Sequence, residues 1–136
     1  MAKQKVEEIE GIGPVLGEKF ATAGVVDTDV LLERGATPAG RKALAEATGL
    51  SESRILGFVN MADLFRIKGV GGEFAELLVG AGVDTVKELA TRNAANLAEK
   101  LAQVNGEKKL TRQVPTLARV EDWIKQAKAL PAVIGH

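Results

Sequence analysis

The chain has 136 residues, of which 46% are hydrophobic and only 4% aromatic, with 18 basic and 18 acidic residues. A core of small aliphatic residues favours closely packed helices over a β-sandwich, and the balanced charge argues against a binder that relies on electrostatic attraction to nucleic acid alone. The absence of cysteine excludes disulfides, thiolate catalysis and cysteine-ligated metals.

The N-terminal residues do not resemble a targeting segment. Residues 1–10 are rich in Lys and Glu and lack an apolar stretch, so we expect no signal peptide. No apolar run approaches the roughly 18 residues that a membrane-spanning helix needs. The sequence therefore predicts a cytoplasmic protein with no membrane partner.

The first half of the chain predicts about five short helices. A short N-terminal helix leads into a turn at Gly11–Gly13, and Pro14 follows at a first-turn position, where its missing N–H costs nothing. The later helices start at residue types that cap N-termini and end near glycine or an aromatic residue. The expected boundaries are Pro14 to Gly24, Asp27 or Thr28 to near Gly35, Thr37 to near Gly49, and Ser51 through Phe65.

The second half repeats the first. The segment IEGIGPVLGEKFATAGV at residues 9–25 matches IKGVGGEFAELLVGAGV at residues 67–83, which lies 58 positions later. Thr85, Asn93 and Thr116 are the expected helix starts, and Gly106 matches Gly49. The last helices match at an offset of 65, which places a basic insertion at residues 107–114.

These matches predict an all-α fold of two duplicated units, packed as a pseudo-two-fold pair. The expected organisation is a first unit at residues 1–66, a second at 67–130, and a flexible tail at 131–136. Neither unit is long enough to bury a large core alone, so we expect them to share one. The candidates for that shared core are Phe58, Phe65, Trp123 and Leu130, although Trp123 could alternatively stack on a base.

The two turns carry a family resemblance. Residues 9–14 and 67–72 resemble helix-hairpin-helix motifs. Each unit is similar to the N-terminal domain of RecA-like recombinases and to the C-terminal domain of the RNA polymerase alpha subunit, and the expected architecture is SAM-domain-like. The whole chain resembles bacterial duplicated helix-hairpin-helix proteins of unknown function.

That resemblance implies contact with a nucleic-acid backbone without reading of its sequence. Glycines let a phosphate approach closely, and the N-terminus of the following helix attracts an anion. The implied contacts come from the backbone of Gly11 and Gly13 in the first unit and of Gly69 and Gly71 in the second, while Ile12 and Val70 plug the turns into the core.

Basic side chains near the turns are few. Val15 and Glu73 stand where DNA-binding members often carry Lys or Arg, so we expect affinity at or below the non-specific range of roughly 10⁻⁴ to 10⁻⁶ M. The candidate phosphate contacts are Lys19 in the first unit, Arg66 and Lys68 beside the second turn, and Lys108, Lys109 and Arg112 in the insertion. The alternative interpretation of the insertion is a solvated loop, as most short charged insertions are.

Two functions remain open from the sequence. The first is a weak, sequence-independent module for the DNA or RNA backbone. The second is a protein–protein interaction adaptor in which the turns are purely structural, with the apolar segment 130–134 as a candidate contact. We expect no catalysis, cofactor, metal or small-molecule substrate, because Tyr and Cys are absent and the single histidine is His136.

Overall fold

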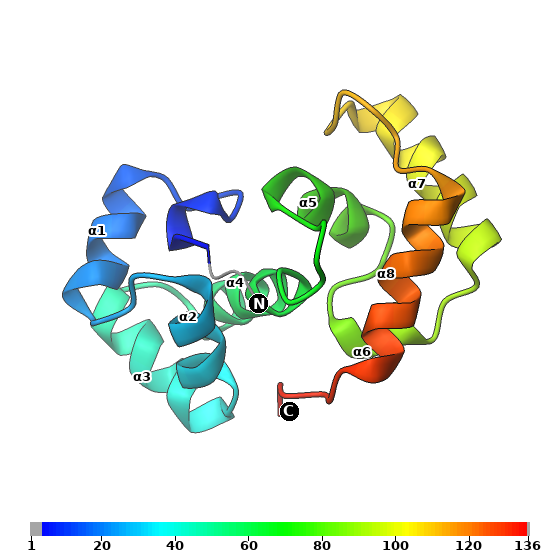
Figure 1. Cartoon of the computed structure of the whole chain (residues 1–136). Helices are drawn as coiled ribbons and strands as arrows, with labels where there is room; N and C mark the ends of the chain where they lie inside the picture. The colour runs from blue at the N-terminus through cyan, green and yellow to red at the C-terminus, as the bar shows by residue number, and fades with distance from the viewer. Residues whose placement is uncertain (1–3, 136) are drawn as a thin grey trace.

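The computed structural model describes residues 4–135 and contains eight α-helices and one short 3-10 helix (Figure 1). The elements are η1 (Val6–Glu8), α1 (Pro14–Thr22), α2 (Thr28–Gly35), α3 (Pro38–Thr48), α4 (Glu52–Leu64), α5 (Gly72–Gly80), α6 (Val86–Ala90), α7 (Ala94–Lys108) and α8 (Leu117–Ala129). The only β feature in this range is an isolated bridge between Lys5 and Asp27. The predicted all-α class is confirmed.

The predicted helix starts are confirmed by their capping hydrogen bonds. Each capping side chain accepts from the backbone N–H three residues later, which satisfies a donor that the helix itself leaves unpaired. The caps are Asp27, Thr37, Ser51, Thr85, Asn93 and Thr116.

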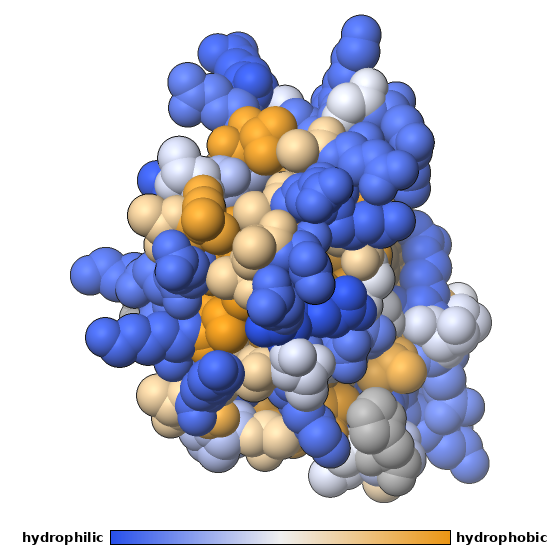
Figure 2. Space-filling model, turned by 90° about the vertical axis from the view of Figure 1, so that its right-hand side faces the viewer, coloured by the Kyte–Doolittle hydropathy of each residue, from blue (hydrophilic) through white to orange (hydrophobic). Residues whose placement is uncertain are grey.

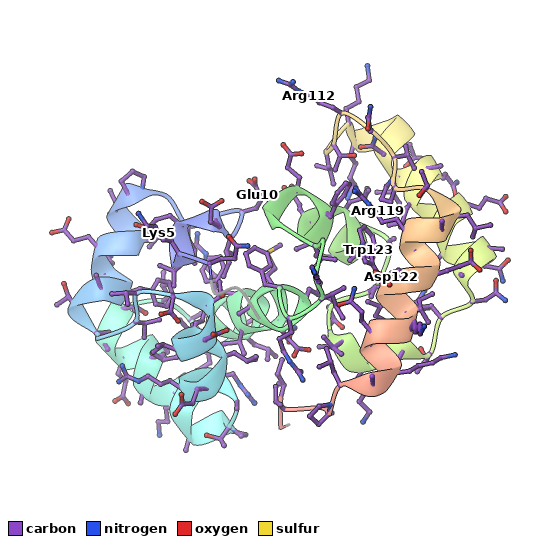
Figure 3. All side chains as sticks on the ribbon, in the orientation of Figure 1. Lys5, Glu10, Arg112, Arg119, Asp122 and Trp123 are labelled. Carbon is purple, nitrogen blue, oxygen red and sulfur yellow. The ribbon has the colours of Figure 1, made fainter. Side chains whose placement is uncertain are left out.

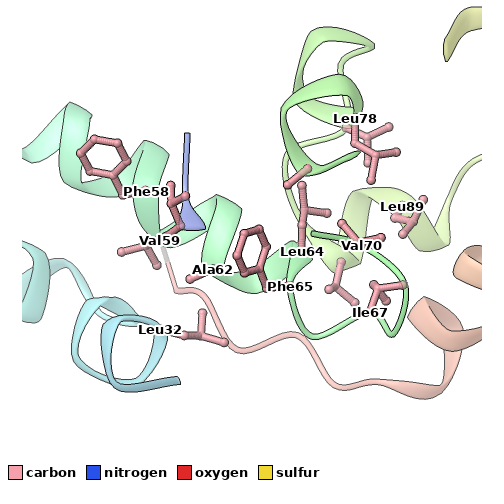
Figure 4. Packing of buried hydrophobic residues seen from close by; sticks show 14 of the residues in the cluster. Leu32, Phe58, Val59, Ala62, Leu64, Phe65, Ile67, Val70, Leu78 and Leu89 are labelled. Atoms are coloured by element: carbon pink, nitrogen blue, oxygen red, sulfur yellow. The ribbon is translucent and has the colours of Figure 1, made fainter. Parts of the chain in front are cut away.

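Helix α4 connects the two sides of the molecule. It packs against α2 and α3 of the first unit and also against α5, while α8 packs against α6 and α7 (Figure 1). Hydrophobic side chains continue from α4 through the second turn to α5, as Figure 4 shows for Phe58, Phe65, Val70 and Leu78. None of the helices described has the length and apolarity needed to cross a membrane.

Local contacts recur at the matched positions. Gly11 and Gly69 have φ angles of 96° and 99°, which are values that side chains disfavour. The Ile12 and Val70 N–H groups each donate to the carbonyl three residues earlier, at 3.1 Å in both cases. The pseudo-two-fold relation between the units stays a prediction.

Three of the four predicted shared-core residues are buried, and Leu130 is partly buried. Phe58 makes an edge-to-face contact with Phe20, at 6.1 Å between ring centroids, and Trp123 contacts Phe74 at 5.3 Å. Each ring pair lies within a single unit, so Phe58 and Trp123 chiefly fill the core of the unit to which they belong. This placement also favours the core role of Trp123 over base stacking.

The insertion is only partly a loop. Helix α7 continues through Gly106 to Lys108, and Lys109, at φ 52°, takes the left-handed position that Gly49 takes after α3. The following loop is held by Asn105, whose side chain exchanges two hydrogen bonds with the backbone of Thr111 at 2.9 and 3.1 Å. The loop therefore begins at Lys109, two residues after the start of the predicted insertion at residue 107.

Residues 131–135, predicted to be flexible, lie against the first unit and are here called the strap. The Gly135 N–H donates to the Ala36 carbonyl at 2.7 Å, and the buried Arg41 guanidinium donates to the Gly135 carbonyl at 2.7 Å. Ile134 packs partly buried against the core, so the segment is not a free apolar patch. His136 lies outside the described residues.

Candidate binding site

The first turn (residues 9–13) is surrounded by carboxylates. The N–H groups of Gly11 and Gly13 donate no hydrogen bond to any of residues 4–135. The Glu7 side chain lies along α1, where a Cβ built at Gly17 would be 2.8 Å from its Cγ. Glu8 and Glu10 are exposed beside the turn. This acidic setting disfavours a phosphate at the first turn.

The second turn (residues 67–71) is pinned by Gln126 of α8. Its amide oxygen accepts from the Lys68 N–H at 2.8 Å, and its amide nitrogen donates to the Lys68 carbonyl at 3.1 Å. The same nitrogen donates to Asp122 at 2.9 Å, which fixes the orientation of the amide. The N–H groups of Gly69 and Gly71 have no acceptor among the described residues.

A groove of about 760 Å³ runs between this turn and the C-terminal part of α8. Residues 65–71 line it together with Gln4, Gln126, Ala129 and Leu130. The charged residues of this lining are Arg66 and Lys68, and no Asp or Glu belongs to it. The groove is thus a mainly apolar hollow with a basic edge.

The side chain of Arg66, a predicted phosphate contact, is buried and bonded to other groups of the protein. Its side chain is 7% exposed, pairs with Asp63 at 2.7 Å and donates to the Pro131 carbonyl of the strap at 2.8 Å. Asp63 also accepts from the Val86 N–H at 2.8 Å, so the pair ties α4 to α6 and the strap. These bonds disfavour the predicted contact between the Arg66 side chain and a polyanion.

The other predicted contacts lie on separate elements of the fold. The exposed side chains are Lys19, Lys68, Lys108, Lys109 and Arg112, whereas Ile12 and Val70 are buried as expected of core plugs. Figure 3 places Arg112 on the loop beyond α7, and Glu10 on the other side of α5. Hydrophilic and hydrophobic residues are interspersed over the α7–α8 side (Figure 2).

Helix α5 docks on the first turn. A Cβ built at Gly72 would lie only 2.3 Å from the Glu8 carbonyl oxygen, so the helix start is in close contact with the end of η1, immediately before the first turn. One helical turn later, Glu76 is half-buried, and its pKa is raised by burial and then by the nearby Glu10 carboxylate. Two turns along, Val79 lines a cleft with Met61 of α4. Gly72 and Glu76 therefore lie on the docked side of α5, and Val79, which is 38% exposed, lies at its edge.

The sequence repeat relates the surface that α5 contacts to a second surface on the second turn and α8, which we call the docking face. At an offset of 58, Arg66 and Lys68 stand in place of Glu8 and Glu10. At an offset of 65, Lys125, Gln126 and Ala129 of α8 stand in place of Asn60, Met61 and Leu64 of α4. The position that carries Glu10 on the occupied face thus carries Lys68 on the open one.

Sequence reasoning missed Gln126 and the exposed side of α8. The offset of 65 was visible in the sequence, but only the structure shows that the first unit uses these positions to hold a helix. Among residues 4–135, no group of three His, Asp or Glu side chains has a metal-binding arrangement.

Comparison with known proteins places the chain in a family without assigning it an activity. No curated protein and no solved structure matches it. The family model described as "Domain of unknown function (DUF4332)" matches residues 10–130, which is most of the chain. The protein belongs to this family.

Proposed function

We propose that the protein is an interaction module that binds a helix of a protein partner on the docking face formed by the second turn and α8. The observation that carries this proposal is the contact of α5 with the first turn and α4. The first unit already uses the corresponding surface, built from the first turn and α4, to hold a helix. A helix is therefore the ligand for which this chain offers an internal precedent.

The shape and polarity of the docking face support this role. Its groove combines apolar lining from Val70, Ala129 and Leu130 with a polar edge from Lys68 and Gln126. Apolar contact supplies most of the affinity in such grooves, while charges at the rim set orientation and partner choice. Because Gln126 fixes the Lys68 peptide, the face needs little reordering on binding.

A nucleic-acid backbone is the second candidate for the same face. Two observations favour it: the groove lining contains two basic residues and no carboxylate, and the N–H groups of Gly69 and Gly71 have no acceptor within residues 4–135. The helix-hairpin-helix resemblance points the same way. Against it, the Arg66 side chain is already paired and Glu73 occupies the first turn of α5. Few phosphate contacts remain.

A peptide titration separates the two candidates. A labelled peptide of residues 69–83, which contains α5, is titrated with the protein and followed by fluorescence anisotropy, beside labelled duplex DNA. We expect saturable peptide binding that Lys68→Glu weakens about tenfold, or roughly 1.4 kcal/mol. Lys87→Glu, at an exposed position on α6, is the matched control and should leave binding unchanged.

Two results would count against the protein partner. Peptide binding that is equally strong in Lys68→Glu would place the site elsewhere. DNA binding that weakens steeply with salt, with no peptide binding, would make the nucleic-acid backbone the ligand of this face.

A further inference from the structure

Helix α1 of a second copy of the chain is a candidate ligand for the docking face. Helix α1 corresponds to α5 at the offset of 58, so Pro14, Glu18 and Ala21 match the docked positions Gly72, Glu76 and Val79. All three α1 residues are exposed. If α1 of one copy docked on a second copy as α5 docks on the first turn, copies would add head to tail into rings or open chains.

Charge favours such a contact. In the docked arrangement, Glu18 would face the position of Lys68. In the occupied interface, by contrast, Glu76 lies near Glu10, which raises its pKa, and near Lys108, which lowers it. Opposite charges at an interface rim favour encounter, and like charges oppose it. Electrostatics alone would therefore let the chain self-associate.

The backbone geometry opposes this docking of α1 on a second copy at Pro14. At the start of α5, a Cβ would come within 2.3 Å of the Glu8 carbonyl oxygen, and glycine is the residue that avoids this overlap. The corresponding carbonyl on the docking face belongs to Arg66, and the corresponding residue of α1 is Pro14. Proline brings a Cβ and a rigid ring to a place where no side-chain atom fits.

Resting on the proposed function, we infer that Pro14 excludes α1 of a second copy from the docking face. By the same geometry, the helix that the face accepts has glycine at its first position and a carboxylate one turn later. The partner is thus an acidic helix with a glycine start, as α5 is. Pro14 acts as a specificity-determining residue that keeps the face free for it.

Sedimentation of variants at position 14 tests this inference. Wild type is expected to sediment as a monomer, whereas Pro14→Gly should form larger species as its concentration rises. Pro14→Ala keeps the Cβ and should stay monomeric. Pro38→Gly, which removes the first-turn proline of α3, controls for helix weakening and should also stay monomeric. Adding Lys68→Glu to Pro14→Gly should restore the monomer.

Several outcomes would overturn the inference. A folded Pro14→Gly protein that remains monomeric, or a Pro14→Ala protein that assembles equally well, removes the steric role of residue 14. Assembly of wild type that Lys68→Glu abolishes would show that proline does not exclude α1. If the peptide of residues 69–83 still binds in these cases, the proposed function stands and only the role of Pro14 fails. A Gly72→Pro peptide that binds as tightly as the unchanged peptide would also contradict the steric role of proline.

Discussion

Trp123 lies against Gly69, and its indole Nε1 would be 3.2 Å from a Cβ at that glycine. The φ angle of Gly69 is 99°, so a side chain there would be strained as well as crowded. The relationship repeats between Phe58 and Gly11, where the corresponding distance is 3.3 Å. In each unit, an aromatic residue from the last helix thus covers the glycine of the turn.

The first prediction concerns this contact. Gly69→Ala should lower the free energy of unfolding by roughly 1–3 kcal/mol, the usual cost of a side chain in a disfavoured backbone region. Urea unfolding followed by the fluorescence of the single tryptophan provides the measurement. Gly71→Ser is the control, because Gly71 has extended backbone, open space around it and a helix-capping position. An equal loss in both variants would contradict the account.

The second prediction concerns the buried pair of Asp63 and Arg66. Asp63→Ala leaves a buried guanidinium without its partner and should destabilise the protein by about 3–5 kcal/mol. Thermal and urea unfolding measure the loss. Glu88→Ala removes the partly exposed partner of Arg92 and should cost less than about 1 kcal/mol. A small effect at Asp63 would mean that Arg66 finds other acceptors.

The third prediction concerns the strap. Ending the chain after Leu130 removes the carbonyls that accept from Arg41 and Arg66, and each buried donor left unpaired should cost about 1–3 kcal/mol. Arg41→Met should matter less in the shortened chain than in the full one, because the shared contact is already lost. A double-mutant cycle on unfolding free energies measures this coupling, and strict additivity would contradict it.

The fourth prediction is a pH dependence at Glu76. Its pKa is raised in the folded state, first by burial and then by Glu10, so its favourable contribution is complete below about pH 4.5 and is lost as pH rises through the folded pKa. Glu76→Gln should therefore stabilise the protein at pH 7 and lose that advantage near pH 4. Carboxyl NMR titration in a Glu10→Gln background should give a lower pKa for Glu76; an unchanged value would place the cause elsewhere.

Local features of the fold could be predicted from the sequence. Caps such as Ser51 and Thr116 act within three residues, and the glycine turns repeat at one offset, so both follow from short-range patterns. The strap could not be predicted in this way, because Arg41 and Gly135 are 94 positions apart and nothing local marks their contact. The insertion was predicted from residue 107, whereas α7 continues to Lys108, because Lys109 takes the helix-ending conformation in which glycine is the usual residue.

Only part of the candidate site could be predicted from the sequence. The second turn and Lys68 were identified, but the side chain of Arg66 was assigned to a polyanion although Asp63 lies three residues earlier, at helical pairing distance. Gln126 carried no signal of its own, since its role depends on the meeting of α8 with a turn 58 positions earlier. A docking surface is a property of packed elements, and periodicity within one helix does not reveal it.

NMR mapping of the peptide contact on the protein is the sharpest test of the docking face. Unlabelled peptide of residues 69–83 is added to ¹⁵N-labelled protein, and amide shifts are followed to about 1 mM peptide, equivalent to about −4 kcal/mol of binding. The largest shifts are expected at residues 66–71 and 122–130, and Lys68→Glu should require about tenfold more peptide to produce them. Shifts confined to the first turn or to the α7 loop, or no shifts at all, would contradict binding at the docking face.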